Sequence, residues 1–229
     1  MTGNYQLPDE VREEITSLSV AGRHDSGRLL ELLGDAAQLY NRGRFKEALA
    51  LSKKVLSELR ESVTARELTG LCCYALGKWR DAATYLQWVT DTTGDPTQIP
   101  TLMDANRALR HYDEVASLFR KLQQSSPLAD VMAEGRIVFA ESLADQGMVA
   151  EGISLLEEAG IRRKIRNPQR RHYRQWYALG DLYEKAGNIV SARRMFQITA
   201  EHDGGETDAR DRLSFIGRNG LVRRPASRK

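Results

Sequence analysis

The sequence has few of the residues on which disulfide-bonded or metal-bound structures depend. Among its 229 residues are 2 cysteines and 6 prolines, and aromatic residues make up 7%. The cysteines, Cys72 and Cys73, are adjacent, a geometry poorly suited to a structural disulfide, and two are too few for a metal site. We expect both to be small buried hydrophobic residues in a reducing compartment, with a reactive vicinal dithiol as the alternative.

Long apolar runs are also missing. No stretch approaches the roughly 20 apolar residues that a membrane-spanning helix needs. The amino terminus, MTGNYQLPDEVREE, lacks a basic segment followed by an apolar one, so a secretory signal is not expected. These features predict a cytoplasmic protein that does not interact with membranes.

Convergent catalytic groups are absent as well. The four histidines, His24, His111, His172 and His202, are scattered without a His or Cys at metal-ligand spacing. No glycine-rich phosphate loop occurs in the context of a strand and a lysine. The sequence therefore predicts a non-catalytic protein with no cofactor and no metal.

Charge is nearly balanced overall but unevenly distributed. The net charge is +3, yet residues 1–160 carry 17 Lys and Arg against 24 Asp and Glu, net −7, whereas residues 161–229 carry 17 against 7, net +10. The densest basic segment, IRRKIRNPQRRHYR at 161–174, has seven Arg or Lys and no acid. Such asymmetry bears on partners and not on the fold.

What the chain does contain is an internal repeat. NRGRFKEALAL (41–51) and ALGKWRDAATYL (75–86) coincide at a shift of 34, which aligns Gly43 with Gly77 and Phe45 with Trp79. Related stretches begin at 110, 145 and 176. Scarce proline and abundant Ala, Leu, Glu and Arg favour helices. Each copy is therefore predicted to form two antiparallel helices, with a lone glycine ending the first, and neighbouring copies must stack to bury their apolar faces.

This pattern resembles tetratricopeptide repeats. The fifth copy, WYALGDLYEKAGNIVSARRMF, matches the family pattern at Trp176, Leu179, Gly180, Tyr183, Gly187, Ala192 and Phe196. The resemblance covers about residues 29–200 and implies a right-handed α-solenoid of about five antiparallel helix pairs with a capping helix at each end. Asp35 and Thr69 depart from the pattern, and Pro100 implies a short first helix in copy three.

The predicted organisation follows from these copies. It consists of an amino-terminal capping helix and linker (1–28), an array (29–204), a carboxy-terminal capping helix (205–218) and a basic, disordered tail (219–229). The five repeats span 29–62, 63–95, 96–130, 131–160 and 173–204, with a basic insertion at 161–172.

The resemblance implies a scaffold that binds a partner peptide or helix in a concave groove formed by the first helices. The groove positions implied by offset are Leu33, Ala37, Tyr40, Leu68, Leu71, Tyr74, Asp104, Arg107, Glu141, Asp145, Arg174, Tyr177, Asp181 and Glu184. They are apolar at one end and mostly acidic at the other, which suits a protein or peptide partner with apolar and basic residues. The alternative is that these positions are simply solvated or belong to interhelical packing.

The family's carboxylate clamp is not supported, because its positions in the first two copies are Leu33, Ala37 and Leu68. Trp88 is expected to lie under the neighbouring segment DTTGDPTQIP, or else to be an exposed interface anchor.

A second function remains open for the basic segment. Nucleic acid or another polyanion would bind through the basic loop at 161–174 and the basic carboxy-terminal tail, with Arg162, Arg163, Lys164, Arg166, Arg170 and Arg171 as candidate contacts. A solvated loop is the competing explanation. In a third hypothesis, the basic tail occupies the acidic groove of the same or another copy of the chain. The sequence does not indicate whether the chain forms a homo-oligomer.

Overall fold

The computed structural model describes residues 7–160 and 165–219, with side chains up to residue 216. In these ranges every regular element is helical, so the all-α class predicted from the sequence is confirmed. No helix within the same ranges is long and apolar enough to cross a membrane.

The chain divides into two compact units, which we call the amino-terminal unit (1–118) and the carboxy-terminal unit (119–229). The first contains α1 (Asp9–Gly22), α2 (Ser26–Asn41), α3 (Phe45–Glu58), α4 (Val63–Ala75), α5 (Trp79–Thr93), the 3-10 helix η1 (Pro96–Gln98) and α6 (Ile99–Ala108). Helix α7 (Tyr112–Gln124) spans the division. The second contains α8 (Ala129–Asp145), α9 (Val149–Glu158), α10 (Arg170–Lys185), α11 (Ile189–His202) and α12 (Ala209–Asn219).

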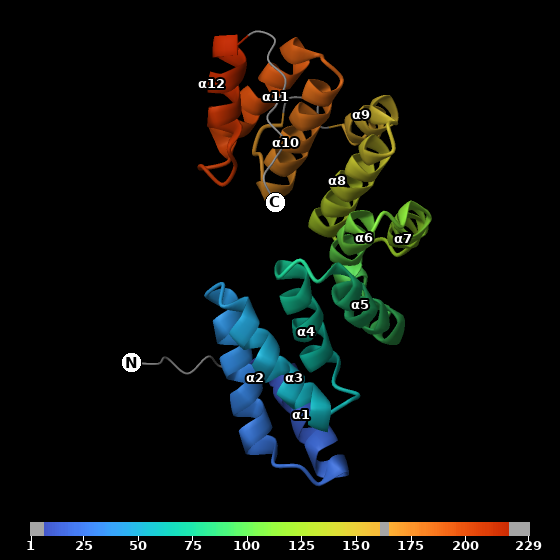
Figure 1. Cartoon of the computed structure of the whole chain (residues 1–229), viewed down its shortest axis with the longest axis vertical. Coiled ribbons are helices and arrows are strands. Elements are labelled where there is room, and N and C mark those ends of the chain that lie inside the picture. Colours follow the sequence, from blue (N-terminus) through green and yellow to red (C-terminus); the bar gives the residue numbers. More distant parts are fainter. Residues whose placement is uncertain (1–6, 161–164, 220–229) are drawn as a thin grey trace. The chain divides into compact units, whose positions relative to one another are not determined.

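Consecutive helices pack as pairs within each unit: α2 with α3 and α4 with α5 in one, α8 with α9 and α10 with α11 in the other (Figure 1). The turn inside each pair has one geometry. In the first, Gly43 adopts φ +74° and the Arg44 N–H donates to the Leu39 carbonyl at 2.9 Å. This left-handed cap ends the helix, and a Cβ would be penalised there.

Copy three departs from this pattern in two ways. Arg110 stands where the other copies have glycine, and it adopts the same left-handed conformation, with φ +61°. The first helix of the copy, α6, has only 10 residues and carries Pro100 in its first turn, preceded by η1. Proline is tolerated there because the first N–H groups of a helix have no intrahelical partner.

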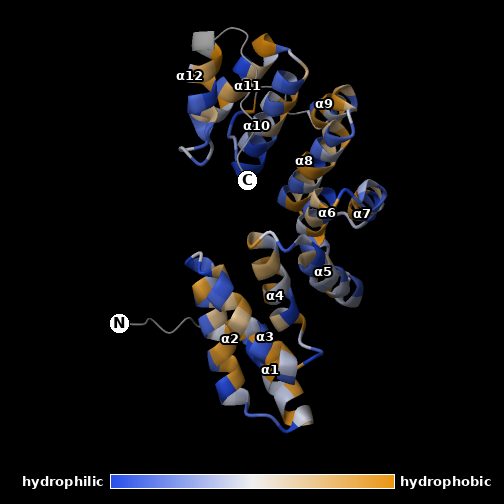
Figure 2. Cartoon of the chain, in the orientation of Figure 1, coloured by the Kyte–Doolittle hydropathy of each residue, from blue (hydrophilic) through white to orange (hydrophobic). Residues whose placement is uncertain are grey.

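Small residues allow close helix contacts. A Cβ on Gly180 of α10 would lie 2.9 Å from the Phe196 ring of α11, and one on Gly152 of α9 would lie 2.7 Å from the Ala140 carbonyl oxygen of α8. Around these contacts Trp176, Leu179 and other large residues fill the core of the carboxy-terminal unit. Each helix carries both hydrophobic and hydrophilic residues (Figure 2), as expected where one face is buried and the other is exposed.

The two terminal helices pack on the ends of the helical pairs. In α1, Ile15 is fully buried with Leu29 and Leu33 of α2. Helix α12 packs against α11 and begins at Ala209, four residues after the predicted start at 205. The intervening turn is held by Asp203, whose carboxylate accepts the Gly205 N–H at 2.9 Å.

Helices α8 and α10 begin close to the approximate repeat boundaries predicted from the sequence. Helix α8 begins at Ala129, where a repeat was expected from about 131, and α10 begins at Arg170, where one was expected from about 173. Residues 161–164 of the predicted insertion and residues 220–229 of the predicted tail lie outside the described residues.

Candidate partner-binding surface

In the amino-terminal unit, the first helices carry a row of half-buried apolar side chains. These are Ala37 and Tyr40 of α2 and Leu68, Leu71 and Tyr74 of α4. We call these five residues the aromatic stripe. Each retains some exposed surface, and Tyr40, Leu68 and Tyr74 also pack against the buried core of the unit.

The two tyrosines of the stripe are held in the same way, one repeat apart. The Tyr40 ring meets Phe45 edge-on at 5.3 Å between centroids, and the Tyr74 ring meets Trp79 edge-on at 5.4 Å. Phe45 and Trp79 are the residues two positions after the turn glycine in their copies. Edge-to-face contacts of this kind are a preferred arrangement of aromatic rings, so contacts within the chain orient both tyrosine rings.

The hydroxyls of the two tyrosines differ. Tyr74 donates to Asp104 Oδ2 of α6 at 2.5 Å, and Arg107 Nε donates to the other Asp104 oxygen at 2.9 Å. In the described residues, the Tyr40 hydroxyl has no hydrogen-bond partner. Burial raises the pKa of Tyr40, so the group stays a neutral donor that a partner can use.

Leu33 does not belong to this surface. Its side chain is 0% exposed and packs with Ile15 and Leu29 where α1 covers α2. Its position on the first helix matched the expected groove offset, but the capping helix α1 takes the place that a partner would occupy. We therefore leave Leu33 out of the candidate surface.

In the carboxy-terminal unit, the equivalent positions are already occupied by Arg212 of α12. Its guanidinium donates to Asp181 at 3.0 Å, to Glu184 and to the Tyr177 hydroxyl at 3.3 Å. It also lies 4.7 Å from the Phe196 ring centre. The Arg212 side chain is only 11% exposed. We call Tyr177, Asp181 and Glu184 the acidic cluster, and its polar groups are satisfied from within the chain.

The ionisation of the acidic cluster follows from these contacts. Burial disfavours charge on Asp181, but hydrogen bonds and charges from Lys185, at 2.9 Å, and from Arg212 outweigh it and lower its pKa. Burial and the hydrogen bond from Tyr177 to Asp208 at 2.5 Å raise the pKa of Tyr177 to about 12. The cluster is thus two carboxylates neutralised by two cations, with a neutral tyrosine beside them.

A further charged pair completes this face. Arg174 of α10 forms a bidentate pair with Glu134 of α8, in which Nη2 donates to Oε2 at 2.7 Å. Bidentate pairs of this geometry are among the stronger ionic contacts. Glu141 of α8 is half-buried and Asp145 is exposed, and each makes an interaction within the chain.

Comparison with known proteins places these helices in a fold. A thermophilic TPR protein of Thermus thermophilus superposes with a TM-score of 0.65 at 18% identity, covering 82% of this chain and 97% of that one. A protein from Podospora anserina, described as a putative kinesin light chain with nearly identical TPR-like repeats, gives 0.60 at 16% identity, covering 79% and 98%. The chain has the tetratricopeptide-repeat fold.

Other comparisons agree with this tetratricopeptide-repeat assignment. Residues 21–89 match a family model described as anaphase-promoting complex, cyclosome, subunit 3. YrrB, described as a TPR protein with an unusual peptide-binding site, gives a TM-score of 0.50 at 18% identity, covering 89% of this chain and 99% of that one. The comparison with curated proteins found no match. The resemblance predicted from the sequence motifs is confirmed.

Three residues of the tetratricopeptide array that lie against the expected groove positions were not identified from the sequence. They are Glu134, Asp208 and Arg212. Charged residues on a capping helix are expected to face solvent, but Arg212 is turned onto α10. A signal existed for Glu134: it lies 40 residues before Arg174, the same shift that separates Gly147 from Gly187 in copies four and five. The opposite charges of Glu134 and Arg174, one repeat apart, therefore indicate an ion pair between neighbouring copies.

The basic segment is partly neutralised. Arg170 pairs with Glu206 at 2.9 Å and Arg171 with Asp130 at 3.0 Å, while Arg166 is exposed. Arg162, Arg163 and Lys164 lie outside the described residues. The acids that pair with Arg170 and Arg171 are distant in sequence. The basic composition of residues 161–174 alone therefore overestimates the charge that a polyanion would meet.

Trp88 and the cysteines are also accounted for within the fold. The Arg66 guanidinium lies 3.9 Å from the centre of the half-buried Trp88 ring, so an arginine of α4 covers part of the ring. Cys72 and Cys73 are both fully buried. Burial raises the pKa of Cys72 to about 12, which keeps it a protonated and weakly nucleophilic thiol.

Within the described residues, no group of three or more His, Cys, Asp or Glu is placed to hold a metal ion. The side chains of the two faces can make apolar contacts, hydrogen bonds and ion pairs. In the carboxy-terminal unit those contacts are made within the chain, and in the amino-terminal unit they are partly unused.

Proposed function

We propose that the chain is a non-catalytic scaffold whose aromatic stripe binds a protein partner. The observation that carries the proposal is the half-exposure of Ala37, Tyr40, Leu68, Leu71 and Tyr74 on consecutive first helices. Rigid aromatic side chains with some exposed surface are the residues that most often anchor protein interfaces. The tetratricopeptide-repeat fold, and the description of YrrB as a TPR protein with a peptide-binding site, support the same function.

The partner's chemistry follows from the stripe and its edge. An amphipathic helix or extended segment would place apolar side chains on Leu68 and Leu71, between the two tyrosines. A hydrogen-bond acceptor on the partner would satisfy the Tyr40 hydroxyl. Residues 1–118 carry 14 Lys and Arg against 17 Asp and Glu, so a basic residue on the segment is favoured.

Polyanion binding is not proposed. Among the candidate contacts, Arg170 pairs with Glu206 at 2.9 Å, and this pairing lowers the charge that phosphate contacts would use. The hypothesis for Arg162, Arg163, Lys164 and Arg166 stays a prediction from the sequence.

Substitution of the stripe tests the proposal. The full chain with Tyr40→Ala and Tyr74→Ala is expected to lose most partner capture in a pull-down from the native host, quantified by mass spectrometry. The matched control is Val190→Ala with Phe215→Ala, which removes two apolar side chains that are 83% and 37% exposed outside the stripe. Circular dichroism confirms that both proteins are folded. Equal capture by the two double variants would contradict the proposal.

A further inference from the structure

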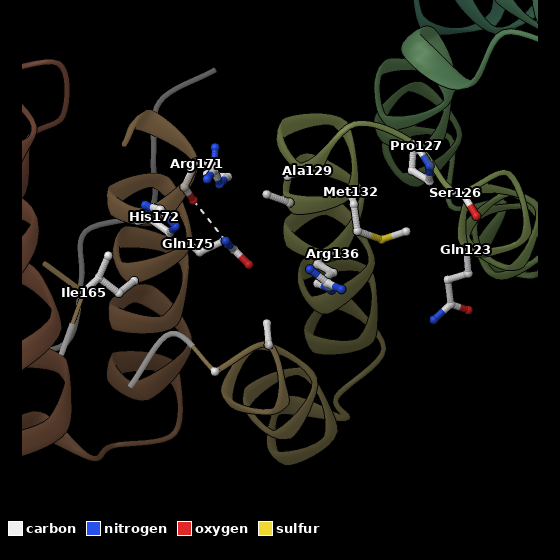
Figure 3. Close-up of a pocket in the computed structure, with 13 residues that line it drawn as sticks. Gln123, Ser126, Pro127, Ala129, Met132, Arg136, Ile165, Arg171, His172 and Gln175 are labelled. Atoms are coloured by element: carbon white, nitrogen blue, oxygen red, sulfur yellow. Dashed lines mark hydrogen bonds between the residues drawn. The ribbon is translucent and has the colours of Figure 1, made fainter. Parts of the chain in front are cut away.

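The carboxy-terminal unit contains an open pocket of about 400 Å³ at the amino-terminal ends of α8 and α10 (Figure 3). One face of α8 lines it through Met132, Ala133 and Arg136, and α10 lines it through Arg171, His172 and Gln175. The volume lies in the range of sites that hold small ligands or a few residues of peptide. None of these residues belongs to the aromatic stripe.

The lining of this pocket is positively charged. It includes Arg136 and Arg171 but no aspartate or glutamate. Arg171 is paired with Asp130, but the Asp130 side chain is 74% exposed, so water screens that pair. Arg136 has no ion-pair partner among the described residues. The positive ends of the α8 and α10 dipoles add to the same potential.

Gln175 supplies a specific hydrogen-bonding requirement. The residue is 4% exposed, and its Nε2 donates to the Arg171 carbonyl at 3.0 Å. That bond fixes the amide orientation and leaves Oε1 buried with no hydrogen-bond partner in the described chain. In Figure 3 this oxygen points from α10 toward the helix that carries Met132 and Arg136. Because a buried acceptor without a partner is unfavourable, a ligand that donates to it gains affinity.

His172 offers the complementary donor. Its Nδ1 accepts the Gln169 N–H at 2.8 Å, so the neutral ring carries its proton on Nε2. Burial and the neighbouring Arg171 lower its pKa, which keeps the ring neutral at pH 7. The pocket thus presents two cations, one neutral donor and one acceptor.

We propose that this pocket binds an acidic peptide segment, with a carboxylate on Arg136 and Arg171 and a backbone N–H donating to Gln175 Oε1. A peptide carries an N–H donor and a carbonyl acceptor close to a side-chain carboxylate, so it matches Gln175 and His172 together. An inorganic anion such as phosphate carries an O–H donor but lacks both the carbonyl acceptor and an apolar group. The apolar side chain next to the acid would pack on Ala133, an apolar residue of the lining.

A peptide titration of the full chain tests this site. The probe is N-acetyl-Leu-Glu-Leu-amide, and the reference is the same peptide with Gln in place of Glu. Nuclear magnetic resonance should show saturable shifts that include the side-chain amide of Gln175. The reference peptide should bind about tenfold more weakly, because a hydrogen bond to a charged group is stronger than one to a neutral group.

Two variants and a control separate binding from folding. Arg136→Gln and Gln175→Leu should each weaken binding of the acidic peptide about tenfold. Gln175→Leu should leave the melting temperature unchanged or raise it, because it removes an unpartnered buried acceptor. Arg194→Gln, an exposed arginine on α11 outside the lining, should bind like the unmodified chain.

Three results would overturn the proposal. The first is the absence of saturable shifts at millimolar peptide. The second is equal affinity for the two peptides or for Arg136→Gln and the unmodified chain. The third is displacement of the peptide by inorganic phosphate or a single-stranded oligonucleotide at lower concentration than the peptide itself, which would indicate a general anion site.

Discussion

In the amino-terminal unit, the first helices leave Tyr40, Leu71 and Tyr74 half-exposed, whereas in the carboxy-terminal unit the corresponding face of α10 is bound by Arg212 of α12. Both faces are built from equivalent positions of the repeat, in different copies. A position in the repeat therefore does not by itself determine whether its side chain is open to a partner. The next helix along the chain decides whether that side chain is bound within the chain.

Removal of the internal occupant should have the largest effect. Arg212→Met leaves Asp181 and Glu184 partly buried without their shared cation, and we expect the carboxy-terminal unit to lose about 3 kcal/mol of stability. Hydrogen exchange of α10 and α11, read by mass spectrometry, measures the change in this unit alone. Arg210→Met, at an exposed arginine of the same helix, is the control. A loss below about 0.5 kcal/mol would show that the acidic cluster does not depend on Arg212.

Alanine in place of the glycine at a close helix contact should lower the stability of the two units by different amounts. A Cβ on Gly152 would meet the Ala140 carbonyl oxygen at 2.7 Å, whereas a Cβ on Gly70 would meet only side-chain atoms, Leu86 Cδ2 at 2.9 Å, Leu86 Cγ at 3.0 Å and Tyr85 Cβ at 3.1 Å. Backbone cannot yield as a side chain can, so Gly152→Ala should destabilise its unit by about 2 kcal/mol. Gly70→Ala should cost less than about 1 kcal/mol, because alanine is the better helix former. Urea unfolding followed by hydrogen exchange checks the order, and the reverse order would contradict it.

One carboxyl group in each unit should change the stability of that unit with pH, in opposite directions. Asp181 has a lowered pKa in the folded chain, so its stabilising contribution is present above the unfolded pKa and is lost as pH falls through the folded value. Glu67 of α4 has a pKa raised by burial, so its ionisation reduces stability as pH rises.

At pH 7, Asp181→Asn should therefore lower the stability of the carboxy-terminal unit. Glu67→Gln, which can still accept the hydrogen bond from Gln98 at 2.7 Å, should raise that of the amino-terminal unit by less than about 1 kcal/mol. Melting curves from pH 3 to pH 8 measure both. Matching pH slopes for the two variants would refute the assignment of opposite signs.

The smallest change in stability is expected on removal of the Tyr40 hydroxyl, which is compared with removal of the Tyr74 hydroxyl. Tyr74→Phe removes the hydrogen bond to Asp104, and we expect a loss of about 1 kcal/mol. Tyr40→Phe removes a hydroxyl with no partner in the described chain, so stability should change by less than about 0.5 kcal/mol. Thermal unfolding compares them directly, and equal losses would mean that the Tyr40 hydroxyl is also bonded.

The fold could be predicted from the sequence because its signals are local. Gly43, Gly77, Gly147 and Gly187 recur at nearly fixed intervals and adopt the left-handed turn that their spacing implied. Even the exception in copy three was visible, because Pro100 marks a shortened helix.

The surface could be predicted only in part. The position of Leu33 gave the correct helix face but not the cover supplied by α1. The pairing of Arg212 with Asp181 and Glu184 depends on how α12 docks on α10, which no local pattern records. Likewise, Arg170 and Arg171 pair with Glu206 and Asp130, acids that are near them only in the folded chain. Tertiary contacts decide which matching positions remain open.

The central claim, that the stripe is open while the acidic cluster is internally occupied, can be tested by site-specific photocrosslinking. The full chain is prepared with a photoreactive phenylalanine at position 40 or, separately, at position 177, and irradiated with the partner recovered in the pull-down. We predict crosslinks to the partner from position 40 and none from position 177. Crosslinking from position 177 with none from position 40, while the partner is still captured, would contradict the account.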